Sequence, residues 1–301
     1  MASAKSLAES LIFPVILCIL LLPTALLWRW ESQKTDHRTD ISTLIWTYLI
    51  TGTIGMAIAM TIQGLLSYLL ALIMFRKDAK EYIKEFTMTE DKIKDAAHRA
   101  KRREMSTRWS YRIFLVIFCF VIAGVLEEGL KYLALMCASR YGTITHDRDY
   151  LIITAAAAVG FATVENLAFV YGSYKNNESP LKLTITILER TIVGLPGHAM
   201  TAALIGVNVL ARDVRGVPMT LSQILGVLVL LHGCHDLVLF IASAYEGNVG
   251  WVHPRKTSTM CVGLGLVIGI QAILVGLLRR RMEELQVAYW SRSLLSWTLA
   301  D

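Results

Sequence analysis

The amino-acid sequence predicts an all-α fold, a polytopic transmembrane helical bundle of about seven spans. Apolar residues make up 54% of the 301 residues and charged residues only 18%, whereas an ordinary soluble domain is about 25% charged. The mean hydropathy is +0.50. So few charged side chains cannot cover a soluble surface, and so high an apolar content excludes a disordered chain. The five cysteines are too scattered for a disulfide scaffold.

Long apolar runs predict the individual spans, since a helix that crosses a bilayer needs about 20 apolar residues. The first run, Leu11–Trp28, is longer than the roughly 7–15 apolar residues of a secretory signal, so we interpret it as a span. The second, Ile41–Phe75, contains no charged residue and predicts one long tilted helix, or a span interrupted near Gly52 and Gly55. Five further spans are predicted at Ile113–Met136, Tyr150–Tyr171, Val193–Ala211, Leu221–Tyr245 and Thr259–Leu278.

Two charged segments interrupt this apolar pattern. The loop Arg76–Arg112 holds twelve Lys/Arg and seven Asp/Glu, a net charge of +5 out of +6 for the chain. We expect a helical hairpin or an amphipathic segment on anionic headgroups there, in the cytoplasm by the positive-inside rule. The net charge therefore indicates a basic cytoplasmic face and no nucleic-acid partner. The segment Leu181–Thr191 carries Glu189 and Arg190 and predicts an interfacial stretch.

These features divide the chain into four parts. Residues 1–75 hold the N-terminal spans, 76–112 the basic loop, 113–245 a core of four spans, and 246–301 the last span and tail. Alternation of the spans from the cytoplasmic loop places the tail outside, although Arg279–Arg281 favours the inside. The span count is therefore open by one.

Ionisable side chains occur inside four consecutive spans. A charged side chain near the bilayer centre costs on the order of 2.5–3.5 kcal/mol, so such residues are rare and commonly functional. The ionisable residues are Glu127, Glu128, Lys131, Glu165, His198, His232, His235 and Asp236, and the polar amide Asn166 follows Glu165. The other three predicted spans contain no charged residue, which indicates a single interior site.

The spacing of these residues indicates pairs within one helix. Lys131 follows Glu128 by three residues and Glu127 by four, so its ammonium can reach either carboxylate. Asp236 follows His232 by four residues and can hold the imidazole in one tautomer. Each pair alone is equally explained by charge neutralisation or helix packing. The occurrence of the whole set favours a functional site.

The residues also form four motifs in order, one per span: Glu-Glu-x-x-Lys at 127–131, Phe-x-x-x-Glu-Asn at 161–166, Gly-His at 197–198 and His-x-x-x-Asp at 232–236. In this combination the chain resembles the PrsW family of intramembrane proteases, whose superfamily includes the type II CAAX prenyl-endopeptidases. The resemblance covers roughly Ile113–Tyr245; the spans before it and the basic loop depart from compact bacterial members. It implies these site residues: Glu127, Glu128, Lys131, Phe161, Glu165, Asn166, His198, His232 and Asp236.

Two chemical schemes for peptide hydrolysis stay open. The chain has neither a Gly-x-Ser-x-Gly nucleophile motif nor a His-Glu-x-x-His zinc motif. In the first scheme Glu127 or Glu128 is a general base and histidines position the water and stabilise the oxyanion. In the second, His198, His232 and a glutamate hold zinc with one position left for water. The absence of a decisive ligand spacing favours the metal-free scheme, so the cofactor is either none or zinc.

The sequence thus predicts an intramembrane endopeptidase in a lipid bilayer that acts on a membrane-associated protein or peptide. One alternative is a non-catalytic scaffold like the γ-secretase subunit of the same superfamily, which has no need of a buried acid–base pair. Another is a proton-coupled transporter, because intramembrane Glu and His also relay protons; no internal repeat of broken helices supports it. The alternatives differ in whether the four motifs converge in one cavity or line a pore.

Overall fold

The structure is a computed structural model, and it describes residues 38–88, 95–175, 180–250 and 256–285, with scattered positions in 21–33 and residues 92, 93 and 254. These residues form helices and no strand. Six helices are long and apolar enough to cross a membrane: Ile41–Phe86, Trp109–Tyr141, Asp147–Tyr174, Leu183–Asp213, Leu221–Tyr245 and Thr257–Glu284. The predicted all-α bundle of an integral multi-pass membrane protein is confirmed. The predicted span Leu11–Trp28 lies mostly outside the described residues.

The second predicted span is one continuous helix with a local change of winding. It consists of α2 (Ile41–Ile50), the π-helical η1 (Thr51–Gly55) and α3 (Met56–Phe75). A Cβ on Gly52 would stand 2.7 Å from the carbonyl oxygen of Gly160. The glycine therefore permits close backbone approach between the two helices, and the predicted interruption is a π-helical turn.

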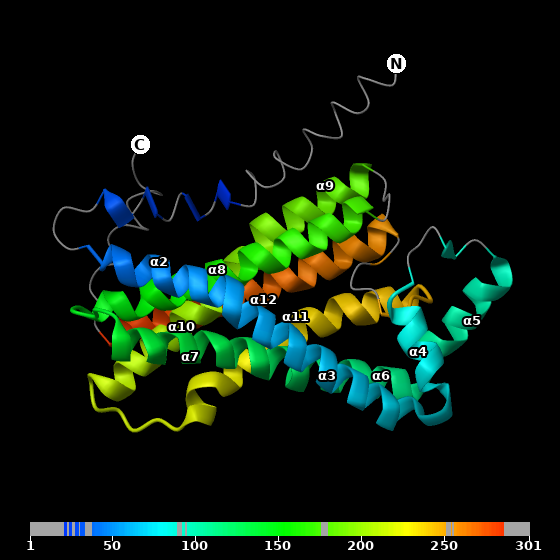
Figure 1. Cartoon of the computed structure of the whole chain (residues 1–301), viewed down its shortest axis with the longest axis horizontal. Coiled ribbons are helices and arrows are strands. Elements are labelled where there is room, and N and C mark those ends of the chain that lie inside the picture. Colours follow the sequence, from blue (N-terminus) through cyan, green and yellow to red (C-terminus); the bar gives the residue numbers. More distant parts are fainter. Residues whose placement is uncertain are drawn as a thin grey trace, which may run out of the picture.

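The central helix is α8 (Asp147–Lys175), which packs against α2, against α7 (Val125–Tyr141) and against α10 (Leu195–Asp213). It lies between neighbouring helices in Figure 1. Its most apolar stretch is 72% buried, against 17% for the span Ile41–Phe86. The spans of α8 and α10 are the best covered of the six, so many of their side chains face protein, which suits polar groups.

Two more spans contain π-helical segments. The first is α6 (Trp109–Ile117), η4 (Phe118–Gly124) and α7, and the second is α9 (Pro180–Leu188), η5 (Glu189–Gly194) and α10. The expectation of a separate interfacial stretch at Leu181–Thr191 is wrong, because this stretch continues into the span and Glu189 and Arg190 are buried. The helices α11 (Leu221–Tyr245) and α12 (Thr257–Glu284) complete the bundle.

The basic loop folds back onto the end of the bundle. After η2 (Arg76–Asp78) it forms α4 (Ala79–Phe86) and, further along, α5 (Ala96–Thr107), at one end of the molecule in Figure 1. The buried Arg102 places Nη1 2.5 Å from Oε2 of Glu85 and donates from Nη2 to the carbonyl oxygen of Val249 at 2.8 Å. This contact joins the loop to the turn that follows α11.

Candidate active site

Four helices bring the ionisable residues of the spans together. Glu127, Glu128 and Lys131 lie at the start of α7, directly after the π-helical η4. His198 likewise follows the π-helical η5 on α10. The other contributions come from α8, with Glu165 and Asn166, and from α11, with His232 and Asp236. The predicted convergence of the four motifs is present, and π-helical turns stand beside two of them, as they often do at functional sites.

Glu128 is the most enclosed carboxylate of this group, with no exposed surface. Its Oε1 accepts hydrogen bonds from Nζ of Lys131 at 2.7 Å and from Oγ1 of Thr201 at 3.4 Å, and lies 2.7 Å from Nδ1 of His232. Lys131 is 1% exposed and also donates to Thr201 Oγ1 at 2.9 Å. The predicted ion pair within α7 thus involves Glu128, and it is tied to α10 and α11.

Glu127 has different contacts from those of Glu128. Its Oε1 accepts a hydrogen bond from Nε2 of Gln63 on α3 at 3.1 Å. Its Oε2 is buried, lies 3.4 Å from Nε2 of His232 and has no hydrogen-bond partner among the described residues. A buried carboxylate oxygen without a partner is costly, so this atom requires an explanation.

His232 has carboxylates at both ring nitrogens. Nδ1 faces Glu128, while Nε2 lies 3.4 Å from both Oε2 of Glu127 and Oδ2 of Asp236. The shortest contact is therefore with a residue of another helix and not with Asp236. Asp236 instead approaches its neighbour His235, with Oδ1 3.0 Å from Nδ1.

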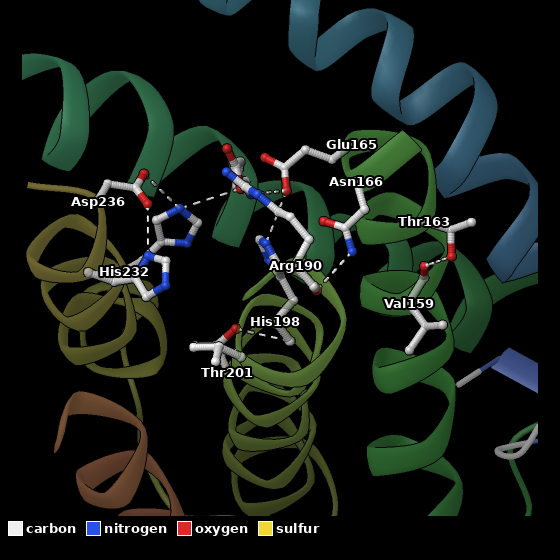
Figure 2. Close-up of polar contacts among 12 residues, drawn as sticks. Val159, Thr163, Glu165, Asn166, Arg190, His198, Thr201, His232 and Asp236 are labelled. Atoms are coloured by element: carbon white, nitrogen blue, oxygen red, sulfur yellow. Dashed lines mark hydrogen bonds and ion pairs between the residues drawn. The ribbon is translucent and has the colours of Figure 1, made fainter. Parts of the chain in front are cut away.

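Glu165 and His198 form a second pair across the site (Figure 2). Oε2 of Glu165 lies 3.3 Å from Nε2 of His198 and 3.5 Å from Nη1 of Arg190. Asn166 faces the backbone of η5, since its Nδ2 donates to the carbonyl oxygen of Arg190 at 3.1 Å. Phe161 is buried and packs its ring 5.8 Å from that of His198.

These side chains surround a cavity of about 250 Å³. Glu127, Glu165, His198, His232 and Asp236 all line it, together with apolar residues such as Met56 and Leu274. Three residues of the set do not line the cavity but contact residues around it: Glu128, Lys131 and Asn166. The set therefore divides into residues that face the cavity and residues that hold them.

Four polar residues of the cavity were not predicted as site residues from the sequence: Gln63, Arg190, Thr201 and Gln271. Gln63 is an uncharged residue of a span without any charge, and Thr201 is a common helix residue, so neither had a signal in the sequence. The sequence predicts Arg190 at the membrane interface and not in the cavity. In the structure Arg190 is buried, lies between Glu165 and Glu189, and covers the ring of Phe169 at 3.6 Å from the centroid.

A potential metal-binding triad is part of the same cavity. One ligand atom each of Glu127, His198 and His232 lies within 4.8 Å of the others. The rings of the two histidines meet edge to face at 5.7 Å between centroids.

Comparison with known proteins assigns the chain to a family. The model of the PrsW family, described as intramembrane metalloproteases, matches residues 39–253, more than two thirds of the chain. The chain belongs to the PrsW family. The match covers all four motifs and also the span of α2 and α3 and the basic loop, so it extends beyond the region Ile113–Tyr245 that carries the resemblance in the sequence.

Two relatives named Protease PrsW support this assignment. The chain is 32% identical to the one from Clostridioides difficile (strain 630) over 132 residues, which is 42% of this chain and 53% of that protein. It is 30% identical to the one from Shouchella clausii (strain KSM-K16) over 125 residues, 40% of this chain and 53% of that protein. The chain thus spans about half the length of these curated PrsW relatives. No solved structure matches it.

Proposed function

We propose that this PrsW-family chain is an intramembrane endopeptidase that hydrolyses a peptide bond of a membrane-associated protein or peptide. The observation that carries the proposal is the single cavity inside the helical bundle, into which Glu127, Glu165, His198 and His232 converge. The proton-coupled transporter alternative would be favoured by polar residues arranged along a pore. The polar residues of the four motifs instead gather around one cavity. The two curated relatives, which this chain matches over about half of their length, are both named as proteases.

The residues of the cavity fit a divalent metal ion such as zinc. Two histidines and one glutamate are a donor set that catalytic zinc sites use, and Glu127 brings a buried oxygen without a hydrogen bond. Three carboxylates and one guanidinium line the cavity, a formal excess of two negative charges before any histidine is protonated. Buried charge of that size requires compensation. We therefore assign Glu127, His198 and His232 as ligands, in place of the metal-free scheme that the sequence favoured.

A bound zinc ion would supply a more acidic water and would polarise the scissile carbonyl. The chain itself supplies the proton acceptor and the alignment. Glu165 lines the cavity and is held by His198 and Arg190 at 3.3 and 3.5 Å. We assign it as the general base that takes the proton from water and delivers it to the leaving amine.

The residues behind the cavity act through their neighbours. Glu128 cannot reach a substrate because it is fully buried, and it orients His232 through Nδ1. A carboxylate at the second nitrogen of a ligating histidine fixes the ring and the tautomer. Lys131 and Thr201 hold Glu128 in turn. Asn166 holds the backbone of η5, the segment that continues into α10.

The experiment separates metal binding from proton transfer. The full chain is reconstituted in vesicles with single-span reporter peptides, and the metal content of each variant is measured together with cleavage. Glu127→Gln and His198→Ala should lose both the metal and cleavage. Glu165→Gln should keep the metal and lose about 10²–10⁴ in rate. The matched control is Glu283→Gln on the exposed end of α12.

Two outcomes would contradict these assignments. Full cleavage by a metal-free preparation in the presence of a chelator would exclude the metal and restore the scheme with a glutamate alone. Glu165→Gln that retains both metal and wild-type cleavage would exclude Glu165 as the base.

A further inference from the structure

A second cavity of about 450 Å³ lies at the end of α3, beside the start of α6 and away from the candidate active site. Met74 and Phe75, the last residues of α3, form its apolar part. Its polar part comes from Arg76, Lys77 and Asp78 of η2, and from Arg108 directly before α6. It is thus lined by the ends of two spans and by the first residues of the basic loop.

The charge of this cavity is positive. Three cations and one carboxylate line it, a formal net charge of +2. Arg108 is fixed in place, since Nη1 donates to Oδ2 of Asp78 at 2.8 Å and Nη2 to Oε1 of Glu104 at 2.7 Å. Arg76 and Lys77 are exposed and have no ion pair within the described part of the chain. Their charges are therefore available to an anion from outside.

The backbone at Arg76 has an uncommon conformation at the edge of this cavity. Its φ is 49°, and no other non-glycine residue of the described chain has a positive φ. Residues that carry a side chain seldom adopt this region, and glycine adopts it freely. Glycine would adopt this conformation with less strain than the arginine that occupies the position.

The position of the cavity along the spans matches the headgroup layer. The apolar helix α3 ends at Phe75, and α6 begins at Trp109, whose side chain is 74% exposed. The guanidinium of Arg112 lies 5.3 Å from the centroid of the Trp109 ring. Exposed tryptophan and arginine at the end of a span are typical of the membrane–water interface. A ligand in the cavity would therefore have its polar part at headgroup depth and its apolar part along α3.

We propose that this cavity binds the phosphate group of an anionic phospholipid, with Arg76 and Lys77 as phosphate ligands and with Met74 against the apolar part of the lipid. Arginine and lysine are the usual partners of phosphate oxygens. A zwitterionic lipid also carries a phosphate, but its ammonium group would meet the same cations, so net anionic lipids are preferred. This site is independent of the proposed peptidase chemistry.

The test measures lipid binding to the full chain in detergent micelles by native mass spectrometry. Phosphatidylglycerol is titrated against phosphatidylcholine, and inorganic phosphate is added as a competitor in a separate arm. The cavity variant is Arg76→Gln/Lys77→Gln. The matched control is Lys80→Gln/Lys84→Gln, which removes the same charge from exposed positions of α4 outside the cavity. Both substitutions lie on the surface, and unchanged thermal unfolding verifies the fold of each.

We expect phosphatidylglycerol to bind in preference to phosphatidylcholine. A hydrogen bond between charged groups contributes on the order of tenfold or more in affinity, so the cavity variant should bind phosphatidylglycerol at least about 10-fold more weakly. The control should stay within about twofold of the wild type. Equal losses in both variants would mean diffuse attraction and overturn the site. Displacement of the lipid by an equal concentration of inorganic phosphate would identify free phosphate as the ligand and overturn the lipid assignment.

Discussion

Nδ1 of His232 lies 2.7 Å from Oε1 of Glu128, although the two residues are 104 positions apart in the chain. The carboxylate four residues after His232, Asp236, is further away at 3.4 Å. The imidazole is therefore oriented by α7 and not by its own helix. This relationship links the Glu-Glu-x-x-Lys and His-x-x-x-Asp motifs, and it gives the two carboxylates of the first motif different tasks.

The contribution of the Glu128–Lys131 ion pair to stability can be measured separately from its contribution to catalysis. Glu128→Met leaves the ammonium of Lys131 buried without a counter-ion, so it should lower the stability by about 3–5 kcal/mol. The double variant Glu128→Met/Lys131→Met removes both charges and should recover most of that loss. Cleavage should stay low in both, because His232 has lost its Nδ1 partner. Thermal unfolding and cleavage are measured together; a stable double variant with wild-type cleavage would contradict the positioning role.

Asp236→Asn should have a milder effect. Its contact with Nε2 of His232 is long, and Glu128 still fixes the ring through Nδ1. Loss of such an indirect partner reduces activity by on the order of 10-fold. The rate of reporter cleavage is compared with that of Glu127→Gln. Equal losses in the two variants would show that Asp236 acts directly in the reaction.

Gln63→Leu tests the contribution of α3 to the site. The amide of Gln63 donates to Oε1 of Glu127 and directs Oε2 towards His232. Its loss should reduce cleavage and metal content by about 10-fold while the protein still accumulates. Thr61→Val is the control on the same helix, since Thr61 is exposed and bonds only its own helix backbone. Unchanged metal content and cleavage in Gln63→Leu would contradict the assignment.

Close packing between α2 and α8 is predicted to depend on Gly160. A Cβ there would stand 3.0 Å from the carbonyl carbon of Tyr48 and nearer still to its oxygen. Gly160→Ala should therefore destabilise the protein by about 1–3 kcal/mol. Gly172→Ala on the same helix meets open space and should be neutral or stabilising by up to about 1 kcal/mol. Thermal unfolding in micelles of the two alanine variants provides the comparison, and similar midpoints would contradict the packing argument.

The basic loop at residues 76–112 should lie in the cytoplasm and the end of α12 on the opposite side. Arg102 joins the loop to Val249, whereas Arg281 contacts Asn208 near the other end of the bundle. The six spans therefore do not remove the conflict between Arg279–Arg281 and the positive-inside rule. Thr87→Cys and Arg279→Cys, in a background without the native cysteines, are labelled with an impermeant maleimide from each side. Labelling of both from the same side would contradict this topology.

Much of this molecule is determined by the sequence alone. Composition and charge-free runs predict a helical membrane bundle, because only helices that satisfy their own backbone can cross a bilayer in such a chain. Five of the predicted spans lie within observed ones and the sixth has the same bounds, Leu221–Tyr245. The sequence also predicts that Lys131 pairs with a carboxylate of its own helix, since residues three or four apart on a helix are neighbours, whereas the choice of Glu128 over Glu127 comes from the structure. The four motifs identify the family before any contact is known.

Only the tertiary structure decided which side chains meet across helices. Spans such as α3 are apolar on every face, so no amphipathic pattern tells which side points inward. The sequence therefore does not predict which side chains are in contact across helices. These contacts are Gln63 with Glu127, Arg190 with Glu165, and Glu128 with His232. These contacts depend on how far each helix is rotated and how closely glycines such as Gly52 and Gly160 let the backbones approach. In a bilayer that approach is governed by packing between small residues and not by hydropathy.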